Sequence, residues 1–231
     1  MGMNNITDPE DGLPPIENWS ELSELSTWNL PEIVEGVFRK SEIFVIYGGS
    51  RYAETSVLMD LALSVASGKE WLGIPTRKGR VLYLNADLSK PALLRRMTQI
   101  QNAKNIIKRT DALEVMHLRG YIESLEMMLY DLKSLSRDRD YSIFIIDLAD
   151  HILKINNVTE TDSILQCAYR FAQETESAIV FTSKELNRIA DTTLALHWEN
   201  ENMYSGKLYS SSFPTKEFDL EWREHLLHRL T

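Results

Sequence analysis

The chain has 231 residues, of which 43% are hydrophobic, and its formal net charge is −9. This length and composition allow one domain with a sizeable core. Because the sequence contains neither an apolar run long enough to span a bilayer nor a basic N-terminal segment followed by an apolar one, we expect no membrane span and no secretory signal. The single cysteine, Cys167, lies in a helical pattern of apolar residues. We therefore expect a buried thiol in a reducing compartment, and with it a cytoplasmic location.

The negative charge is concentrated in an N-terminal arm, residues 1–29. Eight of the 34 acidic residues and no basic one precede Arg39, which leaves 26 acidic against 25 basic residues in the rest of the chain. Prolines and acidic residues predict that the arm is flexible. A short helix that docks on the body or on a neighbouring subunit is indicated by the helical spacing of Trp19, Leu22, Leu25 and Trp28. The body is nearly neutral, so charge neither favours nor excludes contact with DNA.

Residues 30–231 form one predicted α/β domain in which short apolar runs alternate with amphipathic stretches. Strands are predicted at residues 43–47, 80–84, 113–118, 142–146 and 178–182. Helices are predicted at residues 55–67, around 93–97, 122–136 and 161–175. This alternation implies a mostly parallel twisted sheet with helices on both faces. Three further short strands, at residues 193–197, 203–210 and 217–222, are expected to form an antiparallel C-terminal edge.

The loop after the first predicted strand is similar to a phosphate-binding loop. It follows an apolar strand, opens a helix and reads Gly48-Gly49-Ser50-Arg51-Tyr52-Ala53-Glu54-Thr55-Ser56. Backbone N–H groups at such a helix start attract anions. Against the template G-x-x-x-x-G-K-[ST], Gly48 and Thr55 match. Ala53 replaces the second glycine and Glu54 replaces the lysine.

The two departures from the template are expected to affect phosphate binding to different degrees. Ala53 adds one methyl group where the backbone should approach a phosphate closely. Glu54 reverses a charge that would point at the phosphates. One unit charge at about 4 Å, with an effective dielectric near 20, is worth roughly 4 kcal/mol, and this change spans two units. We therefore predict that the nucleotide-binding segment, Gly48 to Ser56, binds Mg-ATP weakly or not at all in the usual pose.

Three further segments lie at informative positions around this loop. Residues 30–38 precede the first strand, residues 61–73 contain the first helix and the loop after it, and residues 79–87 form a second strand with an acidic tip. In this order and spacing they resemble the RepA-type branch of the RecA-like P-loop ATPases, which are hexameric replicative helicases of plasmids and phages and their relatives. The resemblance implies ATP and magnesium as ligands. It also implies a homo-oligomer, such as a hexameric ring, associated with DNA replication or a mobile element.

The resemblance assigns roles to residues outside the loop as well. Asp87 stands where the family has the acid that polarises the attacking water, although it could instead cap the next helix. Asp147 resembles the Walker B aspartate, which would hold magnesium together with Thr55. Lys207 lies roughly where related rings place a cation that reaches the neighbour's site, and its alternative is a solvated strand lysine. The candidates for sensing a γ-phosphate are Thr182, Ser183 and Lys184.

Other chemistry has less support in the sequence. A set of basic residues could contact a nucleic-acid backbone, but acidic and apolar neighbours favour a solvated face. These residues are Arg95, Arg96, Lys104, Lys108 and Arg109. His225 and His228 lie three apart on a predicted C-terminal helix, where a surface pair is favoured over a metal site.

Three functional hypotheses follow. The first is a RepA-like ATPase-fold protein related to DNA replication helicases, impaired in ATP binding and hydrolysis by Glu54, which acts through assembly as an inactive subunit. The second is a non-catalytic interaction or assembly module that has kept the fold. The third is an active NTPase that uses Arg51 or a neighbouring subunit's cation in place of the lysine.

Overall fold

The computed structural model describes residues 16, 18–24, 30–107, 110–121, 124–135, 137–147, 158–188 and 190–230. The chain divides into two units, Met1–Leu30 and Pro31–Thr231. In the first unit, helix α1 comprises Trp19–Glu24. The Asn18 side chain accepts a hydrogen bond from the backbone N–H of Ser20 at 3.0 Å, as expected at a helix start. Leu25 and Trp28, which belong to the predicted helical pattern, lie outside the described residues.

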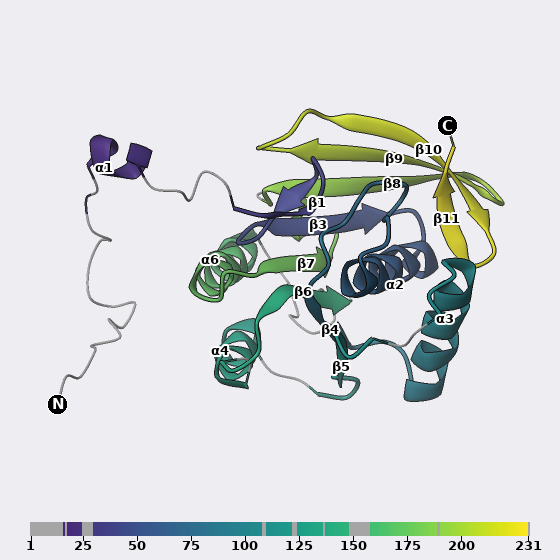
Figure 1. Ribbon diagram of the computed structural model, residues 1–231, viewed down its shortest axis with the longest axis horizontal. Coiled ribbons are helices and arrows are strands. Elements are labelled where there is room, and N and C mark those ends of the chain that lie inside the picture. Colours follow the sequence, from purple (N-terminus) through teal and green to yellow (C-terminus); the bar gives the residue numbers. More distant parts are fainter. Residues whose placement is uncertain are drawn as a thin grey trace. The chain divides into compact units, whose positions relative to one another are not determined.

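The second unit is built on a nine-stranded sheet with the order β11-β10-β9-β8-β3-β7-β6-β4-β5 (Figure 1). Its strands are β3 (Ile43–Gly48), β4 (Arg80–Asn85), β5 (Leu113–His117), β6 (Tyr141–Asp147), β7 (Ala178–Thr182), β8 (Thr192–Asn200), β9 (Met203–Ser210), β10 (Lys216–Arg223) and β11 (Leu226–Arg229). Strands β3 to β8 pair with one another in parallel. Strands β9 to β11 extend the sheet in antiparallel fashion. A separate two-stranded sheet pairs β1 (Glu32–Val34) with β2 (Phe38–Arg39). The predicted α/β class, with its antiparallel C-terminal edge, is confirmed.

Helices cover both faces of the sheet (Figure 1). Helices α2 (Arg51–Ser67) and α3 (Lys90–Ala103) pack on one face, and α4 (Leu125–Leu135) and α6 (Val158–Glu174) pack on the other. Successive strand residues point to opposite faces. In β6, Ile143 and Ile145 therefore join the core under α2, while Phe144 and Ile146 join the core under α4 and α6.

Helix α2 is the most enclosed of these elements. Every residue from Ala53 to Ala66 is buried, including polar Asp60 and Ser64. A helix that is enclosed on all sides needs little amphipathic pattern. Its C-terminus is closed by Gly68, which adopts a left-handed conformation with φ 71.

Three expectations about local structure were wrong. Helix α2 begins at Arg51, four residues before the predicted start at Thr55. His225 and His228 are not on a helix, because residues 224 and 225, with φ 48 and 71, turn the chain from β10 into β11. Cys167 is half-buried rather than fully buried. None of the described helices is both long and apolar enough to cross a bilayer.

Candidate functional site

The order of the strands brings several predicted site residues together at the C-terminal ends of the parallel strands. The parallel strands β3, β7, β6 and β4 are neighbours in that order, so their C-terminal ends lie together. This edge is where ligands bind in open α/β sheets. It carries Gly48, Asn85, Asp147 and Thr182 at the ends of these four strands.

The turn from β3 into α2 is short, and its residues form hydrogen bonds with one another. Ser50 is the N-cap of α2, and its side chain accepts a hydrogen bond from the backbone N–H of Ala53 at 3.2 Å. The Ser50 carbonyl accepts the N–H of Glu54 at 3.0 Å. In an open phosphate-binding loop, N–H groups in this region would face the anion. Here two of them are used within the first helical turn.

The two glycines of the turn serve close packing. Gly48 has φ 89, and a Cβ atom at this position would lie 2.3 Å from the Leu196 carbonyl oxygen on β8. Gly49 has φ 67, and a Cβ atom there would lie 3.4 Å from both Leu196 and Tyr204 side-chain atoms. The turn is therefore pressed against β8 and β9, and only glycine fits at Gly48 without displacing backbone.

The rest of the segment lies in the first turns of α2. Arg51 and Tyr52 are exposed, whereas Glu54 is 8% exposed and Thr55 1% exposed. The Ser56 hydroxyl donates to the Tyr52 carbonyl at 2.7 Å, so it is engaged within the helix. Glu54, at the start of α2, carries the sign of charge that a helix N-terminus favours.

Asp147 is the centre of a buried hydroxyl cluster. Its Oδ1 accepts hydrogen bonds from the Thr55 hydroxyl at 3.1 Å and the Thr182 hydroxyl at 3.3 Å. Its Oδ2 accepts a hydrogen bond from the Tyr83 hydroxyl at 2.7 Å. Asp147, Tyr83 and the Thr55 side chain lie on the face of the sheet covered by α2, and Asp147 has no exposed surface. The predicted pair of Thr55 and Asp147 is therefore in direct contact.

Burial dominates the electrostatics of this cluster. It raises the pKa of Asp147, while the hydrogen bonds from Tyr83, Thr55 and Thr182 act in the opposite direction. Burial also raises the pKa of Tyr83 well above its usual value, with a further rise from the nearby Asp147 charge. Tyr83 therefore keeps its proton at neutral pH and can donate it to Asp147 in a hydrogen bond.

Asp87 lies on the loop after β4, close enough to Asp147 for its charge to raise the Asp147 pKa. The loop is shaped by Asn85, which is fully buried. The Asn85 side chain donates to the Leu88 carbonyl at 2.6 Å and accepts the Leu88 N–H at 3.0 Å. Helix α3 starts after Ser89, which is its N-cap residue, so Asp87 is not the cap considered from the sequence.

The remaining predicted residues separate into two places. Ser183 accepts hydrogen bonds from the backbone N–H groups of Glu185 and Leu186, at 3.1 and 3.0 Å, and so shapes the turn after β7. Lys184 is exposed on that turn. Lys207 lies on β9 and forms an ion pair with Glu217 of β10 at 2.5 Å, away from the Asp147 cluster in sheet order. Its predicted action on a neighbouring subunit stays a prediction.

The predicted basic cluster does not form one surface. Lys104 forms an ion pair of 2.5 Å with Asp60, and the two side chains are only 12% and 5% exposed. Arg96 packs its guanidinium over the Tyr52 ring, while Arg95 is exposed. Lys108 and Arg109 lie outside the described residues. The solvated face expected from the sequence is therefore wrong for Lys104 and for Arg96.

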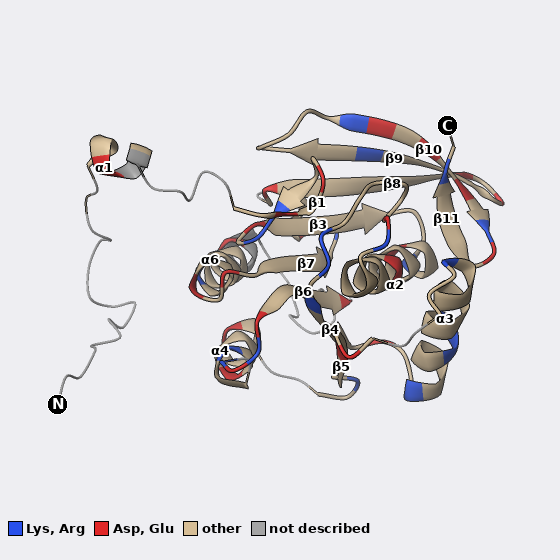
Figure 2. Ribbon diagram, in the orientation of Figure 1, with Lys and Arg blue, Asp and Glu red and all other residues tan. Residues whose placement is uncertain are grey.

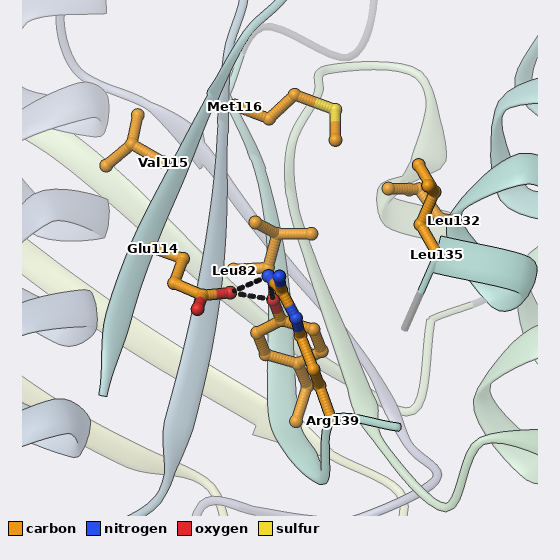
Figure 3. A pocket seen from close by; sticks show the side chains of 8 residues that line it. Leu82, Glu114, Val115, Met116, Leu132, Leu135 and Arg139 are labelled. Carbon is orange, nitrogen blue, oxygen red and sulfur yellow. Dashed lines mark hydrogen bonds and ion pairs between the residues drawn. The ribbon is translucent and has the colours of Figure 1, made fainter. Parts of the chain in front are cut away.

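A pocket elsewhere on the sheet lies between edge strand β5 and α4 (Figure 3). Its base holds Glu114, which accepts hydrogen bonds from Tyr141 and, at 2.7 Å, from Arg139. The Tyr141 hydrogen bond is the main cause of the lowered pKa of Glu114. The other lining residues are Leu82, Val115, Met116, Leu132 and Leu135. Its lining shares no residue with the Asp147 cluster.

A mostly parallel sheet with a glycine-containing turn into a buried helix, facing an aspartate at a neighbouring strand end, defines a P-loop ATPase type of domain. A family model described as an AAA domain matches residues 15–184. Since this is more than half of the chain, the protein belongs to that P-loop ATPase family. The matched region ends before β8, so strands β8 to β11 lie beyond it. No curated protein gives a significant match to the chain.

Members of this family usually bind a nucleotide and magnesium, and the chain meets these two needs unequally. Thr55 and Asp147 offer a hydroxyl and a carboxylate oxygen, which are suitable magnesium ligands. The turn differs from a phosphate-binding loop in two respects, because the Ser50 side chain accepts the N–H of Ala53 and Glu54 stands in the lysine position. Among the described residues, no group of three or more His, Cys, Asp or Glu side chains could hold a metal ion.

Proposed function

We propose that the protein is a RepA-like, RecA-like ATPase-fold protein, related to DNA replication helicases, in which ATP binding and hydrolysis are impaired. The observation that carries this proposal is the closed β3–α2 turn. Its N-cap Ser50 bonds the N–H groups of Ala53 and Glu54 within the chain. A bound triphosphate would have to break these bonds and also approach the Glu54 carboxylate.

Charge and burial act in the same direction at this turn. Glu54 is 8% exposed, so water screens its carboxylate incompletely. Asp147 and Asp87 lie near each other, but they match acids that active relatives also carry, so Glu54 is the residue that changes the charge of the turn. An anionic ligand would therefore meet a carboxylate where an active relative has a lysine.

The proposed role is then assembly rather than turnover. A chain that keeps the fold but binds nucleotide weakly would act as a subunit of a homo-oligomer such as a hexameric ring, or as an inactive subunit among active ones. The strands β8 to β11, which lie beyond the family match, give such a subunit an additional surface. The nearly neutral body of the chain neither favours nor excludes contact with DNA.

Steady-state ATP hydrolysis tests this proposal against the active alternative. The purified chain is expected to hydrolyse ATP no faster than the Asp147→Ala variant, and light scattering is expected to find one oligomeric state with and without ATP. An active NTPase that uses Arg51 or a neighbour's cation predicts clear turnover that Asp147→Ala abolishes. A stable oligomer without turnover supports the assembly role, and a monomer without turnover contradicts it.

A further inference from the structure

A half-buried arginine lies beside the altered turn. The Arg96 guanidinium carbon lies 4.1 Å from the centre of the Tyr52 ring. Tyr52 belongs to the first turn of α2, and its ring also contacts Trp222 of β10, with ring centres 5.3 Å apart and planes at 61°. Residues from α3, α2 and β10 therefore meet in one stack and hold the guanidinium in position.

Arg96 makes no ion pair with any residue in the described part of the chain. Helix α3 itself offers Arg96 no acidic partner, because its charged residues are Lys90, Arg95 and Arg96 (Figure 2). A guanidinium that stacks on an aromatic ring keeps its N–H groups free at its edges. These groups match the paired oxygen atoms of a phosphate.

The Arg96 charge acts on the Asp147 cluster through Tyr83. Arg96 is close enough to Tyr83 for its positive charge to oppose the rise of the Tyr83 pKa, and Asp87 acts on the same hydroxyl with the opposite sign. Tyr83 donates to Asp147 at 2.7 Å. The one cation of α3 that is half-buried is therefore near both the acidic residues of the site and the first turn of α2.

We propose that Arg96 supplies, from α3, the positive charge that the β3–α2 turn lacks, and that it contacts the phosphate groups of a nucleotide at the start of α2. This inference rests on the proposed function in one respect, because it takes the turn to be a nucleotide site that Glu54 weakens. Glu54 and Arg96 then have opposite effects on the same ligand.

Removal of the Glu54 charge exposes the contribution of Arg96. The starting protein is the Glu54→Gln variant, which loses the repulsion without gaining a lysine, and the probe is Mg-ADP in titration calorimetry. Addition of Arg96→Met is expected to weaken Mg-ADP binding by about tenfold or more, because a charge-assisted hydrogen bond is lost. The matched control is Arg95→Met, which removes the same charge from the same helix at an exposed position and is expected to change affinity by less than about twofold.

Two further measurements separate ligand binding from helix packing. Arg96→Lys in the Glu54→Gln background keeps the charge but not the planar fork, so it is expected to retain more affinity than Arg96→Met. Thermal unfolding of all variants reports on packing, and a purely structural role would lower the melting temperature without this order of affinities. Equal affinities for the Arg95→Met and Arg96→Met variants, or no Mg-ADP binding by the Glu54→Gln variant, would overturn the inference. Tight binding by the unaltered chain would instead contradict the proposed impairment.

Discussion

The Thr55 hydroxyl donates directly to the Asp147 carboxylate across 3.1 Å, although 92 residues separate them in sequence. Tyr83 and Thr182 donate to the same carboxylate, so a fully buried acid is surrounded by three hydroxyl groups of its own chain. These three bonds use most of the lone pairs of the carboxylate. The cluster therefore stabilises the fold as well as offering magnesium ligands.

Loss of the Tyr83 hydroxyl should destabilise the protein. Tyr83→Phe removes the shortest of the three hydrogen bonds to Asp147. The buried carboxyl group then has one hydrogen-bond donor fewer. We expect the free energy of unfolding, measured by urea denaturation, to fall by about 1.5–3 kcal/mol. The control Tyr130→Phe alters a side chain that is 69% exposed on α4 and should change it by less than about 0.5 kcal/mol. Similar losses in both variants would show that the Tyr83 bond contributes nothing particular.

Gly48 should tolerate no side chain. Its φ is 89, and an added Cβ would lie 2.3 Å from the Leu196 carbonyl oxygen. Gly48→Ala is therefore expected to lower the free energy of unfolding by more than about 2 kcal/mol, the sum of backbone strain and overpacking. Gly73→Ala provides the control, because Gly73 has φ 70 with nothing within 4 Å of the added Cβ, and only the strain of about 1–2 kcal/mol applies. Equal losses would rule out the clash with β8.

The ion pair between Lys104 and Asp60 should contribute in a pH-dependent way. Burial already raises the pKa of Asp60, while Lys104, the Ser64 hydroxyl and His228 of β11 lower it. Lys104→Met therefore raises this pKa further. A carboxyl group with a raised folded-state pKa contributes its stabilisation below the unfolded-state pKa and loses it as the pH rises through the folded-state value.

The expected cost of Lys104→Met is accordingly small near pH 4 and about 3 kcal/mol near pH 7, where a buried carboxylate is left without its partner. Urea denaturation across this pH range measures it. Lys69→Met removes an exposed lysine from the same region and should show little cost at either pH. A loss for Lys104→Met that does not grow with pH would contradict the assigned role of the pair.

Periodicity was sufficient to predict eight of the nine strands of the large sheet, whereas β11, Leu226–Arg229, was expected to be helical. Buried strands such as β7, Ala178–Thr182, are short apolar runs bounded by polar residues, and their bounds follow from that contrast. The start of α2 could not be predicted this way, because the family template places the helix after the loop, whereas Ser50 caps it early. The same template also made Ser50 a candidate phosphate ligand rather than a cap.

The residues of the candidate site could be predicted only where they belong to a sequence motif. Asp147 and Thr55 belong to known patterns, and the structure brings them into contact. Tyr83 and Arg96 belong to none, because their roles depend on which strand neighbours which and on how α3 packs beside α2. Alternation along β4 places Tyr83 on the same face as Asp147 only when the pairing of β4 with β6 is known.

Titration calorimetry with Mg-ATP most directly tests the central claim, that Glu54 and the closed turn disable the nucleotide site. The comparison is between the unaltered chain and the double variant Ala53→Gly with Glu54→Lys, which restores both template residues. We expect little or no heat from the unaltered chain and binding in the micromolar range, about −8 kcal/mol, for the double variant. If the unaltered chain binds Mg-ATP as tightly as the double variant, the electrostatic account of this site is wrong.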